Sequence, residues 1–156
     1  MLLLRAAAVE RACPMAEAIG AVRAGFAALS AGQAAVPVRT SVPLAGGGVA
    51  LSMPAALAAG PHWSVKLVTV APGNPDRGLP LIAATVLLGD ARTGAPLALL
   101  DGTSLTALRT GAAGGVAARA PDSAVIALFG YAFASFVRTG RALSFAGAFC
   151  LGVRAT

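Results

Sequence analysis

Five strand-like runs follow one another between residues 36 and 100, and only turns separate them. The runs cover residues 36–44, 49–53, 64–70, 81–88 and 97–100, and they consist mainly of apolar and β-branched residues. Gly46, Gly47 and Gly48 separate the first two runs, which is typical of a hairpin. The pattern therefore predicts a sheet built largely of hairpins.

Helical segments flank these runs. A short strand at residues 2–4 precedes a helical stretch, and Pro14 opens a second helix that we expect to run to about Ala31 and to end at Gly32. A third helix is expected from about Thr103 to Ala118. The predicted fold class is α+β, a mixed sheet with helices. The residues of the second helix that we expect to face the core are Ile19, Val22, Phe26 and Leu29.

Composition and charge exclude several classes of protein. A chain of 156 residues has the size of one ordinary domain. The apolar segment 124–137 ends at Arg138 and is shorter than the roughly 20 residues that a membrane span needs. The net charge of +6 comes without a Lys/Arg cluster or a nucleic-acid reader motif. We expect a cytoplasmic protein that binds neither membrane nor nucleic acid.

The residue types that bind metals are sparse. Cys13 and Cys150 lie far apart in the sequence, and His62 is the only histidine. These positions lack metal-ligand spacing, so we predict no metal site. Cys13 precedes Pro14 at an expected helix start, where a thiolate is favoured, but a small apolar filler is the commoner role. His62 is expected to lie in a loop.

Lys66 is the only lysine of the chain, and all other basic residues are arginine. It lies in the strand-like run of residues 63–70. A lysine among arginines favours a site that needs a compact ammonium group rather than a planar guanidinium. The alternative is a strand lysine whose charged end extends into solvent.

Short motifs in a fixed order surround Lys66. They are PVRT at residues 37–40, SMPA at 52–55, Lys66 itself, NP at 74–75 with Gly78 and Pro80, the segment 90–102, and LRT at 108–110. In this order and spacing they resemble the substrate-binding half of the ornithine cyclodeaminase and mu-crystallin family, over about residues 1–130. The resemblance implies a substrate-binding and dimerisation domain, followed by a Rossmann domain that binds NAD or NADP.

The resemblance also implies roles for individual residues. Arg39, Lys66 and Arg109 would hold the carboxylate of an amino or imino acid, because arginine binds a carboxylate bidentately and lysine adds a point charge. Lys66 is the catalytic candidate within residues 1–130. Met53 would line the substrate pocket, and Thr110 would lie near the cofactor phosphates. The alternative for Arg109 is a solvated position on a helix. A homodimer is implied as well.

Leu51 bears on the choice of substrate. Members of the family that use ornithine place a glutamate at this position, and a buried side-chain ammonium needs an acidic partner. This chain has no Asp or Glu between Glu17 and Asp76. An amino-acid or imino-acid dehydrogenase or reductase is therefore favoured over an ornithine cyclodeaminase. A binding or dimerisation module without catalysis is the third alternative.

The last part of the chain departs from the family pattern. Residues 124–129 are expected to form an apolar strand that ends at Gly130, the expected cofactor-binding glycine of a Rossmann unit. Ala132 and Ser135 then stand where further glycines would follow, and no acidic residue follows Asp122. We therefore divide the chain into domains 1–121 and 122–156, with an incomplete second domain and a foreign tail. From this we expect an inactive fragment that does not itself bind NAD or NADP.

Overall fold

The computed structural model describes residues 1–118 of the chain. The strands are β1 (Leu2–Leu4), β2 (Ala34–Ala35), β3 (Thr40–Leu44), β4 (Gly48–Leu57), β5 (His62–Val70), β6 (Ile82–Asp90) and β7 (Pro96–Asp101). The α-helices are α1 (Ala6–Ala12), α2 (Met15–Ser30) and α3 (Gly102–Ala117). Two short 3-10 turns, η1 (Ala45–Gly47) and η2 (Pro75–Arg77), lie in the hairpin loops.

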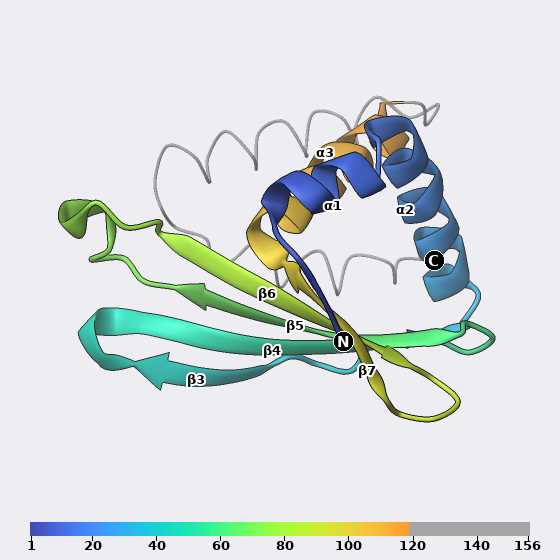
Figure 1. Ribbon diagram of the computed structural model, residues 1–156, viewed down its shortest axis with the longest axis horizontal. Helices are drawn as coiled ribbons and strands as arrows, with labels where there is room; N and C mark the ends of the chain where they lie inside the picture. The colour runs from blue at the N-terminus through green and yellow to red at the C-terminus, as the bar shows by residue number, and fades with distance from the viewer. Residues whose placement is uncertain (119–156) are drawn as a thin grey trace, which may run out of the picture.

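The strands form one mixed sheet with the order β1-β7-β6-β5-β4-β2 (Figure 1). Strands β4 to β7 are joined by successive antiparallel pairs, as the hairpin pattern predicts. Strand β3 pairs with the N-terminal half of β4, and β2 pairs with its C-terminal end. Only β1 runs parallel to its neighbour, β7. The predicted α+β class with a mixed sheet is confirmed.

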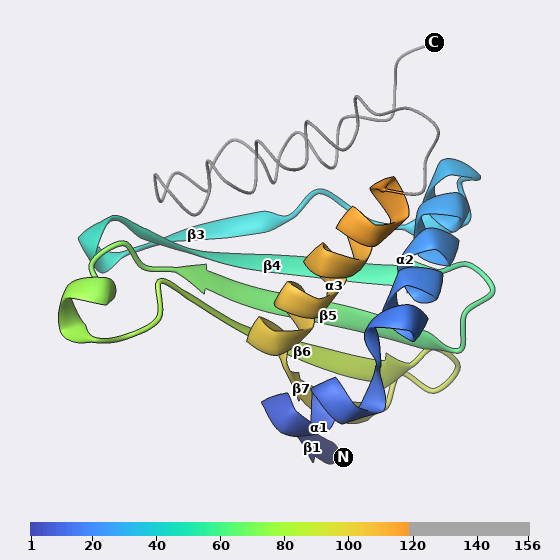
Figure 2. The same cartoon turned by 90° about the horizontal axis from the view of Figure 1, so that it is seen from above.

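The three α-helices lie together on one face of the sheet (Figure 1). Helix α3 contacts β5, β6 and β7 and crosses them obliquely (Figure 2). Because side chains alternate between the two faces of a strand, burial identifies the covered face. Val68 and Val86 point to the helices and are each 8% exposed, whereas Leu67 points away and is 56% exposed. The opposite face, which we call the open face, carries no described helix.

Helix α3 begins directly where β7 ends. The Asp101 side chain caps it by accepting a hydrogen bond of 2.8 Å from the backbone N–H of Ser104. Gly102 is buried against β6, because a Cβ atom there would lie 2.7 Å from the backbone carbonyl carbon of Ala84. The Asp-Gly pair therefore fixes both the first turn of α3 and its close approach to the sheet.

Helices α2 and α3 pack against each other through glycines of α3. A Cβ atom on Gly115 would lie 2.8 Å from Cδ1 of Ile19, and one on Gly111 would lie 3.2 Å from Cε of Met15. A Cβ atom on Gly114, by contrast, would meet nothing within 4 Å. Gly111 and Gly115 therefore line the contact between α2 and α3, whereas Gly114 does not.

Several boundaries differ from the expectations. The first run of the sheet begins at Thr40 rather than at residue 36, and β4 continues to Leu57. His62 is not a loop residue, because it opens β5 opposite Asp90. Leu29 is 44% exposed at the last turn of α2 and does not belong to the core. The expected strand at residues 124–129 and the tail lie outside the described residues.

Within residues 1–118, no single helix has the length and hydropathy to cross a membrane. Helices α1 and α2 satisfy these criteria only when taken as one segment, and a bend of 79° separates them.

Candidate functional site

Lys66 occupies the middle of β5, a central strand. It pairs with Met53 on β4 and with Val86 on β6. Residues that oppose each other in antiparallel strands have their side chains on the same face. Since Val86 is buried beneath the helices, Lys66 also points to the helix-covered face. Its half-buried side chain thus lies between two apolar neighbours.

Two arginines from other elements approach Lys66. Arg39 directly precedes β3, whose first residue, Thr40, pairs with Ser52. The same register places Arg39 beside Met53, at the sheet edge of the row that contains Lys66. Arg109 comes from the middle of α3. The structure therefore brings together four predicted site residues: Arg39, Met53, Lys66 and Arg109.

Burial and the proximity of these cations both change the pKa of Lys66. Its pKa is lowered from the ordinary 10.5 to about 8. Burial is the largest cause, because it disfavours the charged ammonium, and the positive charges of Arg109 and then Arg39 add to it. An anion bound among the three groups would relieve this repulsion.

The acidic residues on the neighbouring elements are engaged elsewhere. Oδ1 of Asp90 accepts hydrogen bonds from the backbone N–H groups of Arg92 and Thr93, at 2.9 and 2.7 Å, and from the Thr93 hydroxyl. These bonds hold the pKa of Asp90 below its usual value. The Ser104 N–H likewise lowers the pKa of Asp101. Residues 1–118 contain no cluster of His, Cys, Asp and Glu suited to a metal ion.

The two predicted cofactor-binding residues are placed differently. Thr110 lies one residue beyond Arg109 on α3, where its hydroxyl donates a hydrogen bond of 2.7 Å to the carbonyl oxygen of Thr106. Gly130 lies outside the described residues. In the described part of the chain, the strand that leads directly into a helix is β7, and the N-terminus of α3 is already capped by Asp101. This helix start therefore does not fit the pyrophosphate of a dinucleotide.

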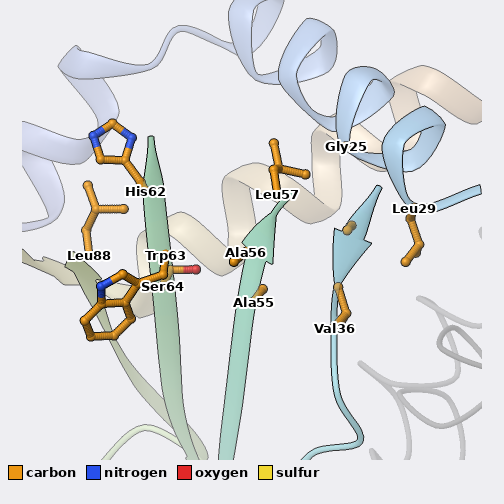
Figure 3. Close-up of a pocket in the computed structure, with 11 residues that line it drawn as sticks. Gly25, Leu29, Val36, Ala55, Ala56, Leu57, His62, Trp63, Ser64 and Leu88 are labelled. Atoms are coloured by element: carbon orange, nitrogen blue, oxygen red, sulfur yellow. The ribbon is translucent and has the colours of Figure 1, made fainter. Parts of the chain in front are cut away.

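A pocket of about 270 Å³ adjoins the cation cluster. Ala55 and Ser64 contribute to its wall, and they form the pair next to Met53 and Lys66 on the same face. Figure 3 shows the Trp63 ring and Leu88 on one side of the pocket, and Leu29 and Val36 on the other. Sequence analysis did not identify Ala55 and Ser64. Their spacing of two residues from Met53 and Lys66 is the signal that could have found them.

The open face of the sheet is a second surface with a distinct composition. One row across five strands is entirely apolar and consists of Leu3, Leu99, Leu87, Val65 and Pro54. Leu67 on this face is 56% exposed, and Val42 is 60% exposed. Among the described strand residues that point to this face, only Asp101 is charged, and it caps α3. A face with this composition fits a protein partner better than water.

Comparisons with known proteins agree with these features. A model of the Ornithine cyclodeaminase/mu-crystallin family matches residues 1–140. Alanine dehydrogenase of Archaeoglobus fulgidus is 41% identical over 118 residues, which make up 76% of this chain and 36% of that protein. A Delta(1)-pyrroline-2-carboxylate reductase of Bacillus cereus is 38% identical over 120 residues, or 76% of this chain and 37% of that protein.

Solved structures give the same picture. Delta(1)-pyrroline-2-carboxylate reductase of Thermococcus litoralis, in complex with NADH and L-proline, has a TM-score of 0.71 at 45% identity, over 75% of this chain and 36% of that one. An archaeal alanine dehydrogenase dimer with bound NAD also scores 0.71, at 41% identity, over 76% and 36%. A lysine cyclodeaminase scores 0.65 at 37% identity, over 76% and 38%. The chain thus spans about a third of the length of these relatives.

Proposed function

The chain belongs to the ornithine cyclodeaminase/mu-crystallin family, and on this premise we propose that residues 1–118 form the substrate-binding part of an NAD(P)-dependent amino-acid or imino-acid dehydrogenase or reductase. The observation that carries the proposal is the position of Lys66 beside Arg39 and Arg109, between the apolar residues Met53 and Val86. Such a site binds a carboxylate. The relatives that are alanine dehydrogenases and pyrroline-2-carboxylate reductases act on compounds of this class.

Each cation has a distinct task in this proposal. The guanidinium groups of Arg39 and Arg109 hold the two carboxylate oxygens and fix the plane of the carboxylate. In its ammonium form Lys66 adds a point charge from below, and the opposite charge of the carboxylate favours that form. Met53 and Val86 exclude water from the base of the site. NAD or NADP, when bound, would supply the hydride chemistry, and Thr110 is the described residue that we expect near its phosphates.

The side-chain environment favours an apolar or cyclic substrate. Leu51 and Val68 form the next pair beyond Met53 and Lys66 on the same face. A substrate ammonium would be desolvated there without an acidic partner. The lyase alternative draws support from the similarity to a lysine cyclodeaminase. Leu51→Glu separates the two, since a carboxylate at this position should raise the relative use of ornithine.

A chimera tests the carboxylate site. Residues 1–130 are joined to the part of the Archaeoglobus fulgidus alanine dehydrogenase that this chain does not match, and oxidation of NADH is followed with pyruvate and ammonia or with pyrroline-2-carboxylate. Lys66→Ala and Arg109→Ala should each lower kcat/KM, with a loss of transition-state stabilisation of roughly 2 kcal/mol or more, because a desolvated carboxylate loses one partner. Arg92→Ala, in an exposed turn, is the matched control. Unchanged kinetics in both site variants would sink the assignment.

The open face completes the proposal. We assign it to a second copy of the chain, because a nearly uncharged sheet face with an apolar row across five strands needs a cover. The archaeal alanine dehydrogenase with bound NAD is described as a dimer. In this arrangement the helix-covered face with the cation cluster remains accessible to substrate, since the two surfaces lie on opposite sides of the sheet.

A further inference from the structure

We propose that Lys66 acts as a nucleophilic amine, which forms an imine with the carbonyl group of a 2-oxo acid whose carboxylate lies between Arg39 and Arg109. This inference rests on the carboxylate site proposed above and adds a covalent reaction to it. The reactive group is therefore the neutral amine of Lys66 rather than its ammonium form.

The surroundings of Lys66 are those of an activated amine. The face it points to carries Leu51, Met53 and Ala55 on β4, and Ala84, Val86 and Leu88 on β6. The charged groups that face it come from α3 and from the segment before β3, namely Arg109 and Arg39. His62 and Asp90 lie on the same face two residue pairs away, and Asp90 is bound within its own turn. A lysine that is desolvated and placed beside other cations becomes a nucleophile near neutral pH.

The protonation of Lys66 gives the scale of the effect. At about pH 7.5, a pKa of about 8 leaves about a quarter of the amine unprotonated, against about one molecule in a thousand at the ordinary 10.5. The chain has no other lysine. A 2-oxo acid therefore meets one side-chain amine, and this amine is available at neutral pH.

The reaction balances without a further reagent. The nitrogen lone pair attacks the keto carbon, the new C–N bond forms, and the carbonyl π electrons move to the oxygen, which takes up a proton. The nitrogen then loses a proton, the hydroxyl takes up a second proton and is expelled as water by the nitrogen lone pair, and loss of the remaining N–H proton leaves a neutral C=N bond. The imine becomes protonated, and the adjacent carboxylate stabilises the resulting cation. Hydrolysis reverses every step, so the free protein is recovered.

Reductive trapping tests the proposal on the full chain. The protein is incubated with pyruvate and cyanoborohydride, digested and analysed by mass spectrometry. We expect the Lys66 peptide to gain one carboxyethyl group, at a rate that rises as the pH approaches about 8. Acetone, the same ketone motif without a carboxylate, should react at least about tenfold more slowly, because it lacks the ionic hydrogen bonds. The α-amino group of Met1, at the opposite sheet edge from Arg39, is the internal control.

The outcomes separate the imine from the carboxylate site. Arg39→Gln and Arg109→Gln should remove most of the preference for pyruvate, and the comparison of pyruvate with acetone on the unaltered protein does not depend on how well these variants fold. If Lys66 stays unmodified while L-proline still shifts the NMR signal of its 13C-labelled side chain, the carboxylate site stands and the imine is refuted. If pyruvate and acetone react with Lys66 at equal rates, the carboxylate site and this inference both fail.

Discussion

Lys66 combines two properties that oppose each other. A carboxylate site gains from a positive charge, yet burial between Met53 and Val86 and the proximity of two guanidinium groups disfavour that charge. The conflict is resolved only when an anion binds. A residue that costs stability in the empty protein and gains it with ligand is typical of functional sites. This cost is measurable without knowledge of the substrate.

We expect the free energy of unfolding to rise with pH between about 8 and 10.5 through Lys66. Its pKa is lower in the folded than in the unfolded chain, so the unfolded state binds more protons in this interval, and stability increases as the protons are lost. Below about pH 8 both states are protonated and the contribution is constant. Urea unfolding at a series of pH values measures it, with Lys66→Gln as the control that removes this rise. Parallel profiles of the two proteins would contradict the lowered pKa.

At the scale of the element, α3 is the part on which the site depends. It delivers Arg109 over β5, and its position is set by Asp101 and Gly102 at one end and by Gly111 and Gly115 along its contact with α2. Small residues allow the two helix backbones to approach closely. A shift of α3 would change the distance between Arg109 and Lys66. The contacts of Gly111 and Gly115 with α2 therefore help to set the geometry of the cation cluster.

Gly115→Ala should destabilise the protein by about 1–3 kcal/mol relative to Gly114→Ala, because the added methyl group would lie 2.8 Å from Cδ1 of Ile19 and this side chain must shift. Gly114→Ala is the matched control one residue earlier. Its methyl group meets nothing within 4 Å, so we expect the higher helix propensity of alanine to stabilise the protein by up to about 1 kcal/mol. Thermal unfolding compares the two. Equal effects would mean that the α2–α3 contact is looser than described.

The sequence predicts these elements well where local chemistry decides their limits. Gly46 has a φ of 78° in the β3–β4 turn, and Pro14 caps α2, so both boundaries follow from backbone preferences. The continuation of β4 through Pro54 could not be predicted in this way. Pro54, which has no backbone N–H, lies between the segments of β4 that pair with β3 and with β2, where no partner on that edge requires a donor.

The candidate site was likewise predictable from the sequence only in part. The ordered motifs indicated Arg39, Lys66 and Arg109, and their meeting depends on the strand register and on α3, which no local pattern specifies. The pocket beside Ser64 could not be predicted without the position of α2, because Gly25 and Leu29 of this helix line it. Residues that act through tertiary contacts are found from the sequence only when a family resemblance supplies the arrangement.

At the scale of the whole molecule, the sheet separates the two proposed tasks, substrate binding and assembly. One face bears the helices and the cation cluster, and the other is nearly uncharged and carries the apolar row that runs from Leu3 to Pro54. Because neighbouring residues of a strand point to opposite faces, a change at Leu67 alters the open face without contacting the cation cluster beside it. Assembly and substrate binding can therefore be tested independently, although Leu67 and Lys66 are adjacent in the sequence.

Leu67→Glu should dissociate the proposed dimer, because two copies of the chain would each bury a carboxylate in an apolar interface without a partner. Leu79→Glu is the matched control, since Leu79 is 54% exposed against 56% for Leu67 but lies in the loop between β5 and β6 rather than on the open face. Sedimentation at micromolar concentration should show dimers for the unaltered chain and for Leu79→Glu, and monomers for Leu67→Glu. The pKa of Lys66 should stay near 8 in the monomer, because the cation cluster lies on the other face. A compact monomer of the unaltered chain would refute the assignment of the open face to a second copy.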